Sequence, residues 1–210
     1  LEPTFDKYLI LLDKPTTVKY NEHLTKTENL EFLTQKEISK KIYYSGKSIL
    51  ADRFTDTDSD IENAMEKDGI PKNIITLAKE LKKGNDIETI QNIESFLKKN
   101  YSYSLQDLPK GRSPVEEFLF NNKKGNCEYF ASAMALLLRS NDIPARLVGG
   151  FLGGYYNKNA GYYAVSNKNA HVWVEALVDN QWIRIDPTPA PISNFTQRQS
   201  LSFMMKIRIY

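Results

Sequence analysis

The stretch "KKGNCEYFASAMALLLRSNDIPARLVGGF", residues 123–151, contains the only cysteine of the chain and changes its hydrophobic period midway. Apolar residues from Phe130 to Leu138 recur at helical spacing, and Pro144 marks the end of that pattern. The residues that follow read as strands separated by turns rich in Gly and Asn. The stretch therefore predicts a buried helix that begins at or near Cys127, followed by a sheet.

Outward from this helix, the sequence predicts three regions. Residues 1–65 are expected to be an extended, β-rich or linker segment that continues from a part outside this chain. Residues 66–192 hold several helical patterns and then the strands, and residues 193–210 are expected to form a C-terminal strand or a tail that leads out of the domain. Helices followed by a mainly antiparallel sheet are typical of an α+β fold.

Composition limits the classes of function. The chain has 210 residues, and its 28 Lys and Arg against 26 Asp and Glu give a formal net charge of +2. Because the basic residues are dispersed, no nucleic-acid partner is expected. One cysteine and two histidines exclude an internal disulfide and a Cys/His zinc site, and we expect neither a metal nor an organic cofactor. No apolar run reaches the roughly 18 residues of a membrane span.

The position of Cys127 gives its sulfur a physical reason to be reactive. The unpaired N–H groups and the positive dipole end of a helix N-terminus favour a thiolate there. The same N–H groups can donate to an oxyanion that forms on an attacked carbonyl. Gly125 is expected to let the backbone turn sharply and to leave the sulfur approachable. The alternative is a buried, inert cysteine that packs as a small hydrophobic side chain.

A nucleophilic cysteine needs a base, and the chain offers His23 and His171. His23 lies in a polar stretch that is typical of the surface. His171 opens a strand, and a turn at residues 179–180 joins it to a second strand that ends at Asp186. In this register Asp186 is a diagonal neighbour of His171, at about 7–8 Å by backbone position. A carboxylate there can accept a hydrogen bond from the imidazole and stabilise its charged form.

Alternation places the residues of this hairpin on two faces. One face is apolar and is expected to pack on the core: Val172, Val174, Ala176, Val178, Ile183 and Ile185. The opposite face carries the polar and aromatic residues: His171, Trp173, Glu175, Leu177, Trp182, Arg184 and Asp186. That face is either part of a functional site or a solvated surface with a Glu175–Arg184 pair. Spacing alone does not predict whether His171 contacts Cys127.

Two segments, "GNCEYFASAMALLLRSNDIPARLVGGF" and "NAHVWVEALVDNQWIRIDPTPA", together with "SPVEEFLFNNKKG" before them, resemble the core of the transglutaminase-like superfamily. The resemblance is to its bacterial membrane-anchored, TgpA-type group. It implies a papain-like fold in which Cys127 is the nucleophile, His171 the base and Asp186 the orienting carboxylate. Members of that group carry transmembrane helices before an extracytoplasmic domain. The resemblance therefore implies a periplasmic or cell-surface location and a membrane-anchored full-length protein.

The resemblance also implies a reaction, in which the cysteine attacks a carboxamide or peptide carbonyl and forms a thioester. The expected substrate is a protein or peptide with a glutamine or other amide group, and a primary amine or water resolves the thioester. Trp173 and Trp182 are expected to shield the site from water, and Tyr103 or Asn126 to complete the oxyanion hole. A cysteine protease or amidase acting on peptide or cell-envelope amides, and a non-catalytic peptide-binding module, remain alternatives. Glu128 has no assigned role.

Overall fold

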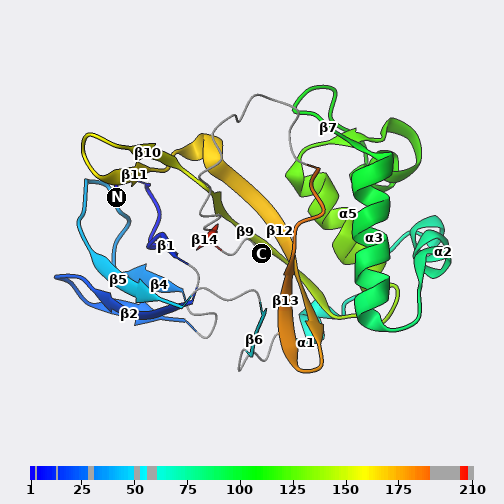
Figure 1. Ribbon diagram of the computed structural model, residues 1–210, viewed down its shortest axis with the longest axis horizontal. Helices are drawn as coiled ribbons and strands as arrows, with labels where there is room; N and C mark the ends of the chain where they lie inside the picture. The colour runs from blue at the N-terminus through cyan, green and yellow to red at the C-terminus, as the bar shows by residue number, and fades with distance from the viewer. Residues whose placement is uncertain are drawn as a thin grey trace.

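The computed structural model describes residues 1–2, 4–12, 14–27, 31–49, 53–55, 61–189 and 204–207. Its central element is a six-stranded antiparallel sheet with the strand order β1–β14–β9–β12–β13–β6 (Figure 1). In that order the strands are Leu11–Leu12, Met204–Ile207, Ala145–Leu152, Ala170–Val178, Gln181–Ile185 and Arg53–Phe54. The predicted α+β class with a mainly antiparallel sheet is confirmed.

Helices cover one face of this sheet. The three long ones, α2 (Lys72–Leu81), α3 (Asp86–Asn100) and α5 (Cys127–Arg139), lie together on that side in Figure 1. α5 packs closest to the sheet because its face with Phe130, Met134 and Leu137 is fully buried. Shorter helical segments are α1 (Ile61–Ala64), α4 (Pro114–Glu117), the π-helical turn η1 (Phe118–Asn122) and the 3₁₀ turn η2 (Asn167–Asn169). The predicted helix that starts at Cys127 is thus confirmed.

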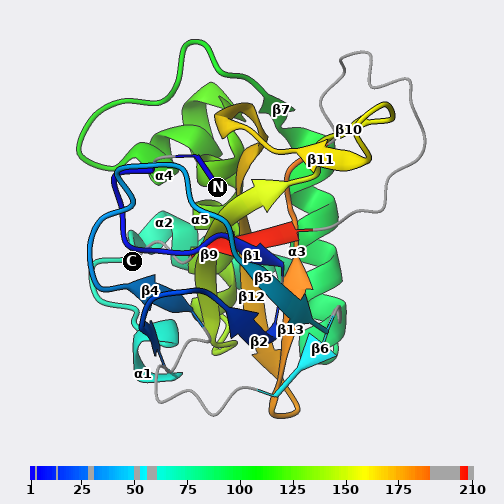
Figure 2. The same cartoon turned by 90° about the vertical axis from the view of Figure 1, so that its left-hand side faces the viewer.

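Short N-terminal strands lie on the opposite face, in front of the sheet in Figure 2. β2 (Pro15–Lys19) pairs with β5 (Ser45–Ser48), and β3 (Leu24–Lys26) pairs with β4 (Phe32–Thr34). They enclose a small core of their own, formed by Leu9, Leu11, Ile38 and Ile42. The N-terminal part also supplies β1 and β6, which form the two edges of the central sheet.

The β12–β13 hairpin has the predicted register. Leu177 pairs with Trp182 and Glu175 with Arg184, across a turn in which residues 179 and 180 both have positive φ. Two consecutive positive φ values fit the tight turns that match strand twist. The apolar face predicted from alternation packs in the main core, since Val172, Val174, Ala176, Val178, Ile183 and Ile185 all belong to that cluster.

The opposite face of the hairpin is buried, so the alternative of a solvated surface is wrong. Trp173 and Glu175 are fully buried, and Trp182 is 1% exposed. The Glu175 Oε2 accepts a hydrogen bond from Arg146 Nε at 2.9 Å, from the neighbouring strand β9, and the Arg146 guanidinium stacks 3.8 Å from the Trp182 ring centroid. Alternation identified the face, but the residues that cover it come from other segments of the chain.

Two further strand pairs lie outside the central sheet, one before α5 and one between β9 and β12. β7 (Ser102–Tyr103) pairs in parallel with β8 (Lys124–Gly125), directly before α5. β10 (Tyr155–Asn157) and β11 (Tyr162–Ala164) form an antiparallel hairpin between β9 and β12. Within the described residues, no helix is both long and apolar enough to cross a membrane.

Candidate active site

The backbone that leads into Cys127 is fixed by the β7–β8 pair. Ser102 donates its N–H to the Lys123 carbonyl at 3.0 Å, and Ser104 donates to the Gly125 carbonyl at 2.9 Å. A Cβ on Gly125 would lie 2.8 Å from Cβ of Tyr129, closer than real contacts allow. Gly125 is therefore required by close packing. We had expected this glycine to provide a sharp turn of the backbone, but its φ is not in the left-handed region that favours glycine.

Asn126 caps the helix that begins at Cys127. Its Oδ1 accepts the Glu128 N–H at 3.1 Å, while its Nδ2 donates to the Glu128 carboxylate at 3.3 Å. This interaction fixes the first turn of α5 and places the Glu128 charge at the positive end of the helix dipole. Glu128 thus stabilises the start of the helix. Its carboxylate also occupies the side-chain amide of Asn126, which we had expected to be an oxyanion donor.

His171 and Asp186 meet where the β12–β13 hairpin opens. His171 Nε2 lies 2.8 Å from Asp186 Oδ2, and the two side chains are 12% and 26% exposed. Asp186 is itself oriented by the Thr188 N–H, which donates to its Oδ1 at 3.0 Å. Thr188 was not predicted as part of the site, although Asp-Pro-Thr after a strand is typical of a turn in which the Asp side chain accepts an N–H two residues later.

Cys127 lies near the same imidazole. Nε2 of the ring faces Asp186, and Cys127 is close enough to the ring to act on its pKa. Burial of the ring opposes its charged form, but the interactions with Asp186 and Cys127 outweigh burial and raise the pKa of His171 to about 9. Burial likewise opposes the charged form of Asp186, yet the contact with His171 keeps the pKa of Asp186 below its ordinary value.

Tyr103 also lies close to the sulfur. The β7–β8 register pairs Tyr103 with Gly125, two residues before Cys127. The pKa of Tyr103 is raised, first by partial burial and second by the nearby charge of Cys127. A phenol held neutral in this way is a hydrogen-bond donor toward a developing negative charge. The structure therefore brings Cys127, His171, Asp186 and Tyr103 together.

The two tryptophans are buried in the protein. Trp182 is buried against Ala64 and Leu177, near the hairpin turn. Leu177, its partner in the register, is six residues from His171, which corresponds to about 20 Å along a strand. Trp173 is closer to His171 but is fully buried against Val148 and Leu152. Neither ring is exposed at the position where we had expected it to exclude water from the site.

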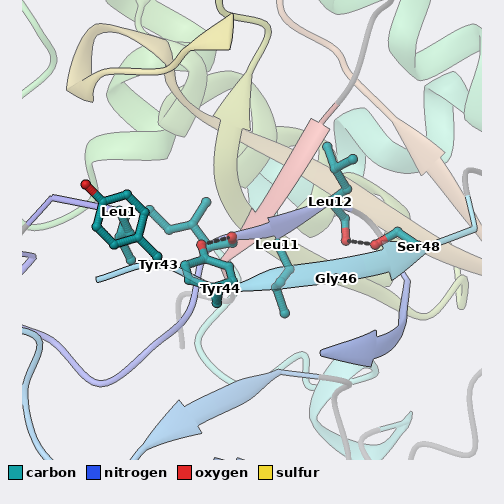
Figure 3. Close-up of a pocket in the computed structure, with 8 residues that line it drawn as sticks. Leu1, Leu11, Leu12, Tyr43, Tyr44, Gly46 and Ser48 are labelled. Atoms are coloured by element: carbon teal, nitrogen blue, oxygen red, sulfur yellow. Dashed lines mark hydrogen bonds between the residues drawn. The ribbon is translucent and has the colours of Figure 1, made fainter. Parts of the chain in front are cut away.

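A hollow of about 320 Å³ lies among the N-terminal strands (Figure 3). Its lining is Leu1, Ile10, Leu11, Leu12, Tyr43, Tyr44, Gly46 and Ser48. The hydroxyls of Tyr44 and Ser48 both donate to backbone carbonyls. Among the described residues no three His, Cys, Asp or Glu side chains form a group that could hold a metal ion.

Comparison with protein families adds an independent finding. Residues 75–187 match the family model of the transglutaminase-like superfamily, and this range contains Cys127, His171 and Asp186. The solved periplasmic domain of TgpA from Pseudomonas aeruginosa superposes with a TM-score of 0.78 at 24% identity, over 89% of this chain and 67% of that one. At this level of identity the likeness establishes the fold.

Two sequence relatives are considerably longer than this chain. YebA of Bacillus subtilis is 34% identical over 183 residues, which are 82% of this chain and 23% of YebA. A protein-glutamine gamma-glutamyltransferase of Pseudomonas aeruginosa is 38% identical over 97 residues, which are 46% of this chain and 14% of that protein. The chain thus spans less than a quarter of the length of either relative.

Proposed function

Because this chain belongs to the transglutaminase-like superfamily, we propose that it transfers acyl groups from glutamine side chains of proteins or peptides through a thioester on Cys127. One observation carries the proposal: Cys127, at the N-terminus of α5, lies close enough to His171 to raise the pKa of its imidazole, and Nε2 of that ring lies 2.8 Å from Asp186. Covalent catalysis by a thiol requires a nucleophile, a base and an orienting carboxylate near one another, so this proximity supports the proposal.

The first half of the reaction forms the thioester. The sulfur of Cys127, deprotonated with the help of His171, attacks the carboxamide carbon and gives a tetrahedral oxyanion. The backbone N–H groups at the start of α5 and the Tyr103 hydroxyl are the donors near this oxyanion. The intermediate collapses as the C–N bond breaks. His171 carries the proton that it took from the sulfur, is kept protonated at neutral pH by its pKa of about 9, and gives that proton to the departing ammonia.

The second half regenerates the cysteine. A primary amine attacks the thioester carbon, His171 takes a proton from the amine nitrogen, and the C–S bond breaks to release the secondary amide. Throughout this cycle Asp186 accepts the Nε2–H hydrogen bond and so keeps Nδ1 directed at the sulfur. No step requires a metal or an organic cofactor.

Water can resolve the same thioester, which would make the protein an amidase or cysteine protease. One observation favours keeping this second candidate: the tryptophans expected to exclude water are buried, and neither ring is exposed to cover the site. Product analysis separates the two reactions. A transferase incorporates a labelled primary amine into a glutamine-containing protein, whereas a hydrolase releases ammonia or peptide fragments and incorporates none.

The decisive variant is Cys127→Ala. Loss of amine incorporation together with retained folding supports covalent catalysis, and retained incorporation would disprove it. Tyr103→Phe tests the oxyanion hole, because removing one donor to an oxyanion lowers kcat by roughly 10²–10³-fold in known cases. If neither amine incorporation nor hydrolysis occurs while peptide binding persists, the protein is the non-catalytic binding module that we considered as an alternative.

The location follows the same proposal. The relative of known structure is a periplasmic domain, and we propose that this chain is likewise an extracytoplasmic domain of a membrane-anchored bacterial protein. Protease accessibility in intact cells or spheroplasts that express the full-length protein tests this, with a cytoplasmic protein as the protected control.

A further inference from the structure

The β10–β11 hairpin presents four exposed tyrosines beside the candidate active site. Tyr155, Tyr156, Tyr162 and Tyr163 are 43–73% exposed. The hairpin projects from the end of the sheet in Figure 2. Aromatic side chains are rarely left in water in such numbers without a function, and tyrosine is enriched at binding surfaces because it combines apolar area with a hydroxyl.

The hairpin is preorganised. Tyr156 and Tyr163 face each other across the two strands, with ring centroids 4.8 Å apart. The turn is closed by Asn157, whose Oδ1 accepts the N–H groups of residues 159 and 160, and whose carbonyl accepts that of Gly161. Gly161 has a φ of +69°, which a glycine adopts without strain. The tyrosines are therefore held in place before any ligand arrives.

The base of the hairpin lies at His171. β9 and β12 pair through Phe151 with Ala170 and Gly150 with His171, so the hairpin leaves the sheet within two residues of the imidazole. Asn169 ties this base together by donating from Nδ2 to the Leu152 carbonyl at 3.4 Å. Tyr155 follows Gly150, the strand partner of His171, by five residues, which extend about 15 Å. A substrate whose reactive group lies at Cys127 can thus reach the tyrosines with residues roughly four positions from that group.

The charged side chains of the hairpin and of its connections to β9 and β12 are all basic. The sequence contains no Asp or Glu between Asp142 and Glu175, whereas Lys158 in the turn and Lys168 near the base are exposed. All three residues of β11 are exposed, and within the described part of the chain β11 pairs in a sheet only with β10, as strand addition requires. Lys41 of the N-terminal part lies near Tyr162 but is paired with Glu2 at 2.7 Å, and it adds no net charge.

We propose that this tyrosine hairpin binds the extended, acidic polypeptide segment that flanks the reactive glutamine of the substrate. The inference rests on the proposed function, which places the reactive glutamine at Cys127. It adds the class of substrate: an unfolded acidic segment that binds through aromatic contacts, strand pairing and attraction to lysines. Such a surface selects substrates by the residues around the glutamine and leaves the chemistry at Cys127 unchanged.

Binding is measured with the Cys127→Ala variant, so that turnover does not interfere. The probe is a fluorescent 14-residue peptide with one central glutamine and three glutamates on each side, and the matched probe carries lysines in their place. We expect the glutamate peptide to bind at least tenfold more tightly at low salt, with the difference shrinking as salt is added. Adding Tyr156→Ser and Tyr163→Ser should weaken that binding at least tenfold, after circular dichroism has shown the fold to be intact.

Ile61→Ser is the matched control, since it removes an exposed apolar side chain from α1, at the other end of the sheet (Figure 1), and should change the affinity less than twofold. Equal affinity for the two peptides, or no effect of the tyrosine substitutions, overturns the proposal. The proposal is also overturned if the protein binds a cell-wall glycan fragment or an anionic vesicle more tightly than the glutamate peptide and the double tyrosine variant loses that binding.

The binding assay also separates this inference from the proposed function. If the wild-type chain incorporates no amine but its Cys127→Ala form binds the acidic peptide through the tyrosines, the chemistry fails and the hairpin proposal stands. If the wild-type chain is active and the double tyrosine variant has the same kcat/KM for the glutamate peptide, the hairpin proposal fails and the chemistry stands.

Discussion

Asp186 Oδ2 lies 2.8 Å from His171 Nε2, although the two residues are 15 positions apart in the sequence. His171 is the second residue of β12 and Asp186 directly follows β13, so one hairpin brings both to the open end of the sheet. Because that hairpin also packs its apolar face on α5, the carboxylate and the imidazole are held against the helix whose first residue is Cys127.

Asp186→Asn should lower the pKa of His171 from about 9 toward its ordinary value near 6.5, because the charged hydrogen-bond partner is lost. NMR titration of the imidazole resonances measures this, and the chain has only one other histidine, His23, as an internal reference. Activity should fall about 10²–10⁴-fold, as when the orienting carboxylate of a triad is removed. An unchanged His171 midpoint would show that the carboxylate does not act on the ring.

The same pKa predicts a pH dependence of stability. The pKa of His171 is higher in the folded state than the ordinary value of about 6.5 in an unfolded chain, so its contribution is complete below pH 6.5 and is lost as pH rises through about 9. The loss should be about 1–2 kcal/mol after allowance for solvent screening. Urea unfolding of the wild type and of His171→Gln at pH 6 and pH 9.5 measures it. A free-energy difference between the two proteins that does not shrink at the higher pH would contradict this assignment.

Alkylation of Cys127 reports its contact with His171. An imidazolium beside a sulfur favours the reactive thiolate, so His171→Gln should slow the reaction with iodoacetamide at pH 6 at least tenfold. Because Cys127 is the only cysteine, the adduct can be followed by intact mass without interference. His23→Gln is the control, and equal rates for the two variants would show that the neighbouring imidazole does not activate the sulfur.

Local pattern was sufficient to predict much of this site. The period change after Pro144 predicted where the helix pattern ends, and the turn at residues 179–180 predicted the hairpin register that brings Asp186 near His171. Contact with Cys127 is not local, since it depends on how the hairpin packs on α5. No pattern in the sequence predicted it, and only the family resemblance implied it.

The burial of the hairpin face that carries Trp182 and Glu175 could not be predicted from the sequence, for a similar reason. Trp182 and Glu175 alternate with apolar residues as in a half-exposed strand, yet both are buried. Arg146, which stacks on Trp182 and pairs with Glu175, lies on another strand. Short N-terminal strands carry too few residues for a clear period, so the layer opposite the helices could not be recognised in advance.

Glu175→Ala should destabilise the fold by about 3–5 kcal/mol, because it leaves the 5%-exposed Arg146 without its carboxylate. The double variant Glu175→Leu with Arg146→Met should recover part of the loss, since both buried charges are then removed. Chemical denaturation measures each change. The surface pair Lys98–Glu94, at 2.7 Å, is the comparison: Glu94→Ala should cost less than 1 kcal/mol. Similar costs for the two pairs would mean that burial does not govern the Arg146–Glu175 interaction.

Gly125→Ala should destabilise the protein and lower its activity together. The new Cβ would lie 2.8 Å from Tyr129 Cβ and 3.1 Å from Phe118 Cδ2, and neither is the free end of a flexible side chain. Relief requires the backbone before Cys127 to move, at a cost of roughly 1–3 kcal/mol for overpacking. Because that backbone pairs with Tyr103, the sulfur and its oxyanion donors would shift relative to each other.

Thermal unfolding and amine incorporation measure the two effects of Gly125→Ala. Lys124→Ala is the control: Lys124 is exposed and adjacent in sequence, so its loss should change stability by less than about 0.5 kcal/mol and leave activity near wild type. If Gly125→Ala unfolds at the wild-type temperature, the close approach of Tyr129 does not constrain this strand. If it is destabilised but fully active at a temperature where it is folded, the glycine serves the packing of α5 alone and not the position of Cys127.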